Sequence, residues 1–334
     1  MSRVLVTGGA GYVGSVCCEE LLRQGYDVTI VDNLSTGHRH AVPEGAEFHH
    51  LDIGNAAGMR EVLGAKPFDA VFHFAAKALI PESVTNPSVF YQVNVVAATT
   101  MIDAVREAGV KRFIFSSTAA VYGNPVELPI PEEHPKAPVN SYGETKLAFE
   151  RLLEWYSRAY GMSVCAFRYF NASGATLSHG EDHVPETHIL PLLFEAALGE
   201  REFFTIYGSD YPTPDGTCLR DYVHVLDIAQ AHILAFQTLN SPGFSVYNIG
   251  LGKSYSVRDV HVRAEQITGL KIPIRKGSSR PGDPAVLCAS PKRLISELGW
   301  DPQYSDLDYI VETAWTWKTR GRMIAPEATQ ARSK

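Results

Sequence analysis

The stretch Val4-Leu5-Val6-Thr7-Gly8-Gly9-Ala10-Gly11-Tyr12-Val13-Gly14 determines how the rest of this chain is organised. Its short β-branched run predicts a buried strand, and its glycines predict a tight turn into a helix. Glycine permits a turn with positive φ, close approach of the backbone to a pyrophosphate and close packing of helix on strand. Because a helix N-terminus presents free N–H groups, the stretch is typical of a dinucleotide-binding turn.

The glycines fit two spacings, and a carboxylate follows them. Gly9, Gly11 and Gly14 match G-x-G-x-x-G, whereas Gly8, Gly11 and Gly14 match G-x-x-G-x-x-G. A second predicted strand ends in Asp32, close to the roughly 20 residues expected before an acid that binds a ribose 2′-hydroxyl. Since a carboxylate there repels a 2′-phosphate, the sequence favours NAD over NADP. The alternative is that Asp32 is a surface residue after an ordinary βαβ turn.

Composition excludes several classes of protein. The 334 residues suffice for one large α/β domain and a smaller lobe, with ordinary hydrophobic (45%) and charged (20%) contents. A net charge of −7 argues against a nucleic-acid partner, and no apolar run reaches the roughly 18 residues of a membrane span. Residues 1–3 lead directly into the first strand, so we expect no signal peptide. Five cysteines without a C-x-x-C motif predict reduced thiols in a cytoplasmic protein.

Strands and helices alternate along the first half of the chain. We expect strands over 4–7, 27–31, 47–50, 69–74, 111–116 and 163–168, and helices over 12–24, 88–108 and 142–160. This alternation predicts an α/β fold, a doubly wound parallel sheet (Rossmann-like) whose active site lies outside the carboxyl ends of its strands.

The regular alternation of strands and helices ends after Asn171, where we expect a smaller, mixed α/β C-terminal lobe. We assign residues 1–170 to an NAD-binding domain, to which 221–250 return with a strand over 245–249. Residues 171–220 and 251–322 form the substrate lobe, and 323–334 a disordered tail.

Tyr142 and Lys146 stand at i and i+4 of a predicted helix, on one face. A phenol that acts as a base near pH 7 needs its pKa lowered by roughly 3 units, about 4 kcal/mol. An ammonium about 4 Å away supplies roughly this much at an effective dielectric constant near 20. The strand over 111–116 runs into Ser116, Ser117 and Thr118, whose hydroxyls complete a proton-transfer site. A solvated helix face and a polar strand end are the alternatives.

Taken together, these motifs resemble the extended short-chain dehydrogenase/reductases. The glycine motif, Asp32, the His-Phe-Ala-Ala sequence at 73–76, Asn94, the Ser/Thr strand end and the Tyr/Lys pair carry the resemblance. The sequences at 168–171 (RYFN), 206–217 (IYGSDYPTPDGT) and 220–225 (RDYVHV) are similar to those of UDP-glucose 4-epimerases. The resemblance extends from Val4 to about Arg320.

The resemblance implies interconversion of UDP-galactose and UDP-glucose on tightly bound NAD. Tyr142, as a phenolate, would take the proton of the sugar 4-hydroxyl while hydride passes from the same carbon to nicotinamide. The resulting 4-keto sugar would rotate about its pyrophosphate and receive the hydride on its other face. Thr118, where the family often has serine, would relay the proton, and Lys146 would hold the nicotinamide ribose and keep Tyr142 acidic.

The resemblance also implies two sets of binding residues. For the cofactor NAD they are Gly8, Gly11, Tyr12, Val13, Gly14, Asp32, Asn33, Asp52, Ile53, Phe74, Ala75, Ala76, Asn94, Ser116, Tyr142, Lys146 and Tyr169. For the UDP-hexose they are Thr118, Asn171, Ile189, Ile206, Tyr207, Arg220, Arg280, Asp283 and Leu287.

Within the substrate set, Arg220 and Arg280 would grip the diphosphate, because guanidinium binds phosphate with two donors. Asp283 would bind a ribose hydroxyl, and Ile206 and Tyr207 would flank the uracil. Surface ion pairs and edge-strand packing are the respective alternatives.

Several departures from the family leave other activities open. Lys77 falls one position before the family's cofactor-facing lysine. Leu287 replaces a tyrosine of some members, which leaves room for UDP-N-acetylhexosamines, and UDP-glucuronate is a further possible substrate.

Two other functions are alternatives to an epimerase. An NDP-sugar 4,6-dehydratase needs an Asp-Glu pair where this chain has Ala119 and Ala120. A non-catalytic NAD-sensing protein would have lost part of the Tyr/Lys/hydroxyl set, which is intact here.

Two further features concern metals and partners. His179, His183 and His188 lie among acidic residues, but their spacing matches no helical face and H-E-x-x-H is absent. We therefore expect no metal and a polar loop that covers the substrate nucleotide. The helices over 88–108 and 142–160 would form a four-helix contact in a homodimer, with packing inside one subunit as the alternative.

Overall fold

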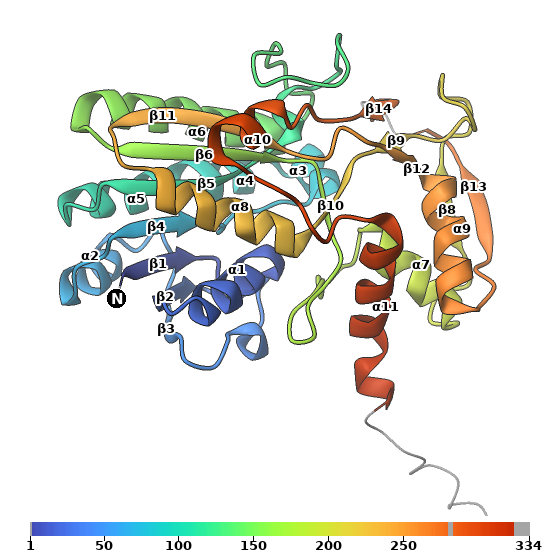
Figure 1. The fold of residues 1–334 in the computed structure, drawn as a ribbon, viewed down its shortest axis with the longest axis horizontal. Coiled ribbons are helices and arrows are strands. Elements are labelled where there is room, and N and C mark those ends of the chain that lie inside the picture. The colour runs from blue at the N-terminus through green and yellow to red at the C-terminus, as the bar shows by residue number, and fades with distance from the viewer. Residues whose placement is uncertain (1, 280–282, 324–334) are drawn as a thin grey trace, which may run out of the picture.

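A seven-stranded parallel sheet forms the centre of the computed structural model, which describes residues 2–279 and 283–323 (Figure 1). Its strand order is β11-β6-β5-β4-β1-β2-β3. The strands are β1 (Arg3–Thr7), β2 (Asp27–Asp32), β3 (Glu47–His50), β4 (Ala70–His73), β5 (Arg112–Thr118), β6 (Ser163–Tyr169) and β11 (Gly243–Ile249). The predicted doubly wound parallel sheet is confirmed, and β11 lies beside β6 at its edge.

Helices cover both faces of the sheet. One face packs against α1 (Tyr12–Arg23) and α8 (Val225–Thr238), and the other against α2 (Ala56–Ala65), α5 (Ala98–Glu107) and α6 (Ser141–Tyr160). Successive β1 residues alternate between the two cores, because Val4 and Val6 belong to one cluster and Leu5 to the other. The sheet is therefore buried on both sides, as a parallel sheet requires.

The segment between β4 and β5 departs from the single helix expected over 88–108. It contains α3 (Ile80–Thr85), α4 (Pro87–Tyr91), the π-helical turn η2 (Gln92–Ala97) and α5. Together Pro87–Glu107 form 21 helical residues with a mean hydropathy of 1.2, long and apolar enough by those measures to span a membrane. Polar residues interrupt this segment, so the sequence contains no continuous apolar run that would signal it. Its buried residues, such as Phe90 and Met101, pack against α2 and α6. A helix that packs against the sheet of a globular domain can have this length and this mean hydropathy too.

The smaller lobe lies beyond the carboxyl ends of the strands (Figure 1). Its own core joins α7 (Ile189–Ala197), α9 (Val257–Thr268), α11 (Leu307–Met323) and β8 (Phe204–Tyr207), which pairs in parallel with β13 (Ile274–Gly277). The remaining elements are η1 (Arg39–Ala41), η3 (Ala119–Val121), β7 (Asn171–Ser173), β9 (Leu219–Arg220), β10 (Tyr222–His224), β12 (Tyr255–Ser256), β14 (Val286–Leu287) and α10 (Lys292–Leu298). The predicted mixed α/β lobe is confirmed. Residues 324–334, where we expected a disordered tail, lie outside the described residues.

Candidate active site

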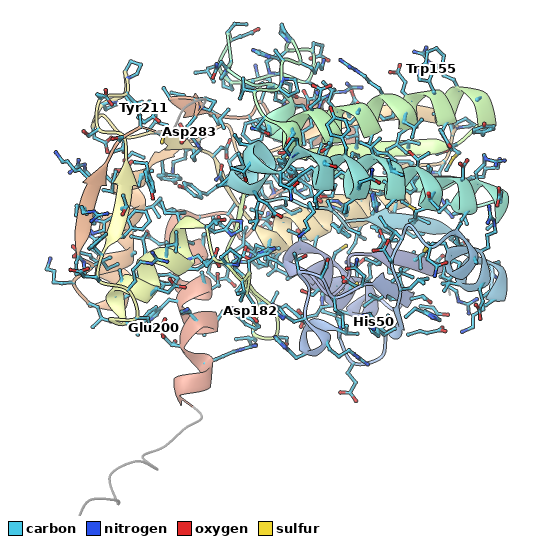
Figure 2. The ribbon with its side chains drawn as sticks, turned by 180° about the vertical axis from the view of Figure 1, so that it is seen from behind. His50, Trp155, Asp182, Glu200, Tyr211 and Asp283 are labelled. Atoms are coloured by element: carbon cyan, nitrogen blue, oxygen red, sulfur yellow. The ribbon has the colours of Figure 1, made fainter. Side chains whose placement is uncertain are left out.

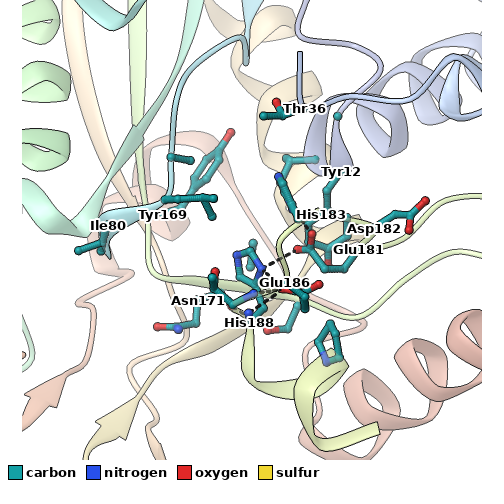
Figure 3. Close-up of a pocket in the computed structure, with 18 of the residues that line it drawn as sticks. Tyr12, Thr36, Ile80, Tyr169, Asn171, Glu181, Asp182, His183, Glu186 and His188 are labelled. Carbon is teal, nitrogen blue, oxygen red and sulfur yellow. Dashed lines mark hydrogen bonds and ion pairs between the residues drawn. The ribbon is translucent and has the colours of Figure 1, made fainter. Parts of the chain in front are cut away.

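A cavity of about 1160 Å³ lies between the carboxyl edge of the sheet and the smaller lobe (Figure 3). Most of the residues that the sequence singles out border it. They are Gly8, Gly11, Tyr12, Val13, Gly14, Asp32, Asn33, Asp52, Ile53, Phe74, Ala75, Ala76, Ser116, Thr118, Tyr142, Lys146, Tyr169, Asn171, Ile189, Tyr207, Arg220 and Asp283.

The turn after β1 has no space for a side chain at two of its glycines. Gly8 has a φ of +77°, and a Cβ on it would lie 2.4 Å from the backbone nitrogen of Ala75. A Cβ on Gly14 would lie 2.1 Å from the carbonyl oxygen of Gly8. The helix α1 that follows has no side-chain cap, so the N–H groups of its first turn face the cavity without an intrahelical acceptor. This cradle of backbone donors fits a pyrophosphate.

Two carboxylates follow at the neighbouring strand ends. Asp32 accepts hydrogen bonds from the backbone N–H of Ala10 (3.0 Å) and of Leu34 (2.8 Å), which fixes its position at the end of β2. Asp52 accepts a hydrogen bond of 2.7 Å from the Asn33 side chain. These acceptors lie on the same wall as the glycine turn, where they fit the ribose of a dinucleotide.

Tyr142, Thr118 and Lys146 all border the cavity, and Thr118 hydrogen-bonds to Tyr142. Asn140 caps α6 by accepting a hydrogen bond of 2.9 Å from Gly143 N–H, which places Tyr142 in the first turn. The buried Lys146 Nζ donates to the Ser116 carbonyl at 2.7 Å and lies 4.7 Å from the centre of the Phe115 ring. Burial lowers the pKa of Lys146 to about 7, and the nearby Glu150 opposes that fall.

The effect of this environment on Tyr142 differs from our expectation. We predicted a pKa lowered by Lys146. Burial instead raises the pKa of Tyr142 in this structure, and the hydrogen bond with Thr118 offsets part of that rise. The physical reason is that enclosing a phenol in protein removes the water that stabilises its anion.

A buried polar network behind the site escaped the sequence analysis. Arg168 Nη2 lies 2.6 Å from Glu150 Oε2, with both side chains almost fully buried. Ser117 donates to Glu150, and Arg168 also donates to the Tyr122 hydroxyl at 2.8 Å. Because these partners come from distant segments, no local spacing signals them. The network joins α6, which carries Tyr142 and Lys146, to the ends of β5 and β6, of which β5 carries Thr118.

Three predicted residues in the described part of the chain do not border the cavity. Asn94 is buried in the π-helical turn, where it accepts from Lys77 N–H (2.8 Å) and donates to Lys77 O (3.0 Å), so it supports the wall from behind. Ile206 belongs to the lobe core, because alternate residues of β8 face opposite sides. Leu287 packs against the buried cluster that contains Tyr122. Arg280 lies outside the described residues.

On the substrate side, Arg220 forms an ion pair with Asp283. We had predicted a diphosphate contact for the arginine and a ribose contact for the aspartate, and the structure brings the two together. Lys77 borders the cavity, with its Nζ 3.9 Å from Glu82 Oε1.

Residues 181–188 form part of the cavity wall beside Tyr12 (Figure 3). Ligand atoms of Glu181, His183 and His188 all lie within 4.8 Å of one another, a proximity that sequence spacing did not indicate. The absence of a metal therefore stays a prediction. Burial lowers the pKa of His188, but Glu181 and Glu186 outweigh it and raise the pKa to about 9.

Residues of two helices that the sequence gave no reason to select hold this loop and the residues just before it. Trp317 of α11 donates to the Glu181 carbonyl at 3.0 Å, and Glu19 of α1 lies 3.0 Å from His179 Nδ1.

Known proteins are similar to this chain in sequence and architecture. The model of the NAD dependent epimerase/dehydratase family matches residues 4–250. The UDP-glucose 4-epimerase of Corynebacterium glutamicum is 46% identical over 315 residues, which cover 94% of this chain and 95% of the relative.

Two solved structures have nearly the same fold. UDP-glucose 4-epimerase from Brucella ovis in complex with NAD has a TM-score of 0.92 at 43% identity, covering 95% of this chain and 98% of that one. UDP-glucose 4-epimerase from Bifidobacterium longum in complex with NAD+ and UDP has a TM-score of 0.92 at 34% identity, covering 96% and 99%. By sequence along most of its length, and by fold, this chain belongs to the NAD dependent epimerase/dehydratase family.

Proposed function

We propose that this protein is an isomerase, an NAD-dependent UDP-glucose 4-epimerase that interconverts UDP-galactose and UDP-glucose. The observation that carries the proposal is the convergence of Tyr142, Thr118 and Lys146 on the cavity that also contains the glycine turn and Asp32. The relatives at 46% and 45% identity named UDP-glucose 4-epimerase support the same activity.

The cofactor site is built from the glycine turn, Asp32 and the wall formed by Phe74, Ala75 and Ala76. NAD, when bound, supplies a reversible hydride acceptor whose oxidised ring carries positive charge. The open N–H groups of α1 would hold its pyrophosphate, and Asp32 a ribose hydroxyl. Lys146 would hold the second ribose, because its Nζ lies at the strand end beside Ser116.

Two side chains of the protein transfer the proton of the sugar hydroxyl. Tyr142 takes the proton of the sugar 4-hydroxyl and later returns it, and the Thr118 hydroxyl bound to Tyr142 relays it. Since burial raises the pKa of Tyr142, the phenol needs nearby positive charge to act as a base at neutral pH. Lys146, one helical turn further along α6, is the residue in place to provide it.

The alternatives find less support. The positions where a 4,6-dehydratase needs an acid pair are Ala119 and Ala120 of η3, so elimination would lack its acid and base. Leu287 packs among buried apolar side chains, so its size gives no argument for UDP-N-acetylhexosamines or UDP-glucuronate. The Tyr/Lys/hydroxyl set is complete, which argues against a non-catalytic NAD-sensing protein.

The test is to incubate the purified protein with UDP-galactose, without added NAD, and to assay for UDP-glucose. We expect conversion, with transient absorbance of reduced nicotinamide. UDP-N-acetylgalactosamine serves as the comparison substrate, and faster turnover of it would replace the proposed substrate. A 4-keto-6-deoxy product would indicate a dehydratase, and an unchanging spectrum without product would indicate a binding protein.

We further propose a homodimer. Tyr91 of α4, Val96 of η2 and Trp155 of α6 are 42%, 52% and 64% exposed, on helical segments that pack side by side. Figure 2 shows Trp155 at the outer surface of α6. Burying these side chains against a second copy would remove apolar surface from water.

We propose a cytoplasmic location without a nucleic-acid or membrane partner. The five cysteines are buried thiols, which suits a reducing compartment. The net charge of −7 disfavours binding to nucleic acid, and the helical segment Pro87–Glu107 is partly buried against the sheet domain.

A further inference from the structure

Two tyrosines border the cavity near each other. Tyr142 lies in the first turn of α6 and Tyr169 ends β6. Burial raises the pKa of Tyr169, and the charge of the Tyr142 phenolate would add to that rise. The proposed reaction needs one phenol to lose its proton and the other to keep it. The structure must therefore distinguish two groups whose intrinsic pKa values are the same.

The contacts of Tyr169 provide this distinction. Its hydroxyl oxygen lies 2.6 Å from Nε2 of His232, and the other ring nitrogen, Nδ1, lies 2.8 Å from the carbonyl oxygen of Ile228. A carbonyl can only accept, so Nδ1 carries the proton. Burial lowers the pKa of His232 to about 4, which leaves the ring neutral and Nε2 as an acceptor. The Tyr169 hydroxyl must then donate to it.

Packing fixes the imidazole ring. His232 is fully buried on α8, with its ring centre 5.0 Å from that of Phe74 and 4.6 Å from that of Phe167. These aromatic rings flank the imidazole and leave it little freedom to turn. Figure 3 shows the Tyr169 hydroxyl pointing away from the wall formed by His183, Glu186 and His188.

Polar contacts of Ser116 place the pair of Tyr169 and His232 beside the reacting groups. The Ser116 side chain hydrogen-bonds to Tyr169, and the Ser116 backbone carbonyl accepts the 2.7 Å hydrogen bond from Lys146. Because the hydrogen of Tyr169 is committed to His232, the phenolic oxygen is an acceptor toward Ser116. The Tyr169 hydroxyl and Lys146 therefore meet the same residue at the end of β5.

We propose that His232 is a positioning residue, whose neutral imidazole holds Tyr169 as a protonated donor so that Tyr142 is the phenol that acts as base. This inference rests on the proposed function. It also assigns Tyr169 the role of a fixed, uncharged wall beside the cofactor site.

The test compares three replacements of His232. His232→Gln puts a carbonyl oxygen near the position of Nε2 and keeps the acceptor for Tyr169. His232→Asn is polar too, but its shorter side chain does not reach Tyr169. His232→Leu removes the acceptor. We expect kcat with UDP-galactose to fall about 10-fold in the Asn and Leu variants, as one lost hydrogen bond predicts, and to stay within about threefold of wild type in the Gln variant.

Two readouts separate positioning from general structural damage. Spectroscopic titration of tyrosinate should reveal one additional phenol ionising at lower pH in His232→Asn, and this change should vanish when Tyr169→Phe is added. Tyr169→Phe alone and combined with His232→Asn should give equal kcat values, since both remove the same contact. If His232→Leu does not fold, the comparison of Asn with Gln remains.

Multiplicative effects of the two substitutions, or an unchanged tyrosinate titration in His232→Asn, would overturn the inference. So would a Gln variant as impaired as the Asn variant. The titration requires no turnover, so it separates failure of this inference from failure of the proposed epimerase activity, which the wild-type assay measures.

Discussion

Thr118 shows how much depends on a single hydroxyl at the residue scale. Its oxygen accepts the Ala120 N–H at 3.1 Å, and its hydroxyl hydrogen-bonds with Tyr142, the interaction that opposes the effect of burial on the pKa of that phenol. We expect Thr118→Val, which keeps the shape and removes the hydroxyl, to lower kcat for UDP-galactose at least about 10-fold. Thr118→Ser should retain most activity. Steady-state kinetics check this, and a Val variant as active as wild type would exclude the hydroxyl from the reaction.

Some residue assignments could be made from sequence and others could not. The glycines, Asp32, Tyr142 and Lys146 sit at fixed offsets within local motifs, so spacing was enough to find them. Of Ile206 and Tyr207, the structure places only Tyr207 at the cavity, because neighbouring strand residues face opposite sides. Sequence alone did not indicate which of the two faces it. The pKa of Tyr142 could not be anticipated, because burial depends on the assembled structure.

At the scale of elements, the turn between β1 and α1 combines positive φ with tight packing. Gly8 and Gly25 have nearly equal φ values, +77° and +82°, but a Cβ would clash only at Gly8, since nothing lies within 4 Å at Gly25. We expect Gly25→Ala to cost about 1 kcal/mol of folding free energy and to retain NAD. Gly8→Ala should lose bound NAD or fail to fold. Denaturation and NAD release after heating measure both, and a Gly8→Ala protein with full NAD content would contradict the cradle.

The loop at 181–188 should respond to alkaline pH. Glu181 and Glu186 raise the folded-state pKa of His188 from an ordinary 6.5 to about 9. A raised histidine pKa stabilises the fold fully below about pH 6.5, and this contribution is lost as pH rises through about 9. We expect Tm to fall between about pH 7 and pH 10, and to fall less in His188→Gln. Parallel Tm profiles for the two proteins would show that the ion pairs contribute nothing.

The existence of most central elements could be predicted, but their interruptions could not. The helical periodicity over 88–108 was real, yet the structure inserts the π-helical turn that contains Asn94. The amide of Asn94 then bonds to Lys77 and Thr145, partners that lie 17 and 51 residues away in sequence. Hydrogen bonds between a buried amide and residues far away in sequence produce no periodic pattern in the sequence, so this turn could not be predicted.

On the scale of the whole molecule, the exposed apolar side chains on α4, η2 and α6 point to association. We expect the purified protein to be a dimer, and Val96→Glu combined with Trp155→Glu to make it a monomer, because buried charges oppose association. Ile295→Glu is the matched control, since Ile295 is 47% exposed on α10, which packs against β11 and α8. Sedimentation or light scattering gives the mass, and a wild-type monomer would refute the dimer.

The sheet domain was more predictable than the smaller lobe. Alternating strands and helices with short connections restrict a parallel sheet to few topologies, so a doubly wound parallel sheet followed from the pattern. The lobe joins α7, α9 and α11, whose shared core depends on contacts between residues more than 100 positions apart, such as Phe194 and Trp315. For the same reason the contribution of α11 to the cavity wall had no sequence signal.

The most direct test of the central claim compares wild type with Tyr142→Phe in the conversion of UDP-galactose to UDP-glucose, both proteins carrying their own NAD. The account predicts at least the ~10²-fold loss of kcat typical of a missing general base, with NAD content and UDP affinity retained. A Phe variant that turns over UDP-galactose at nearly the wild-type rate would contradict it.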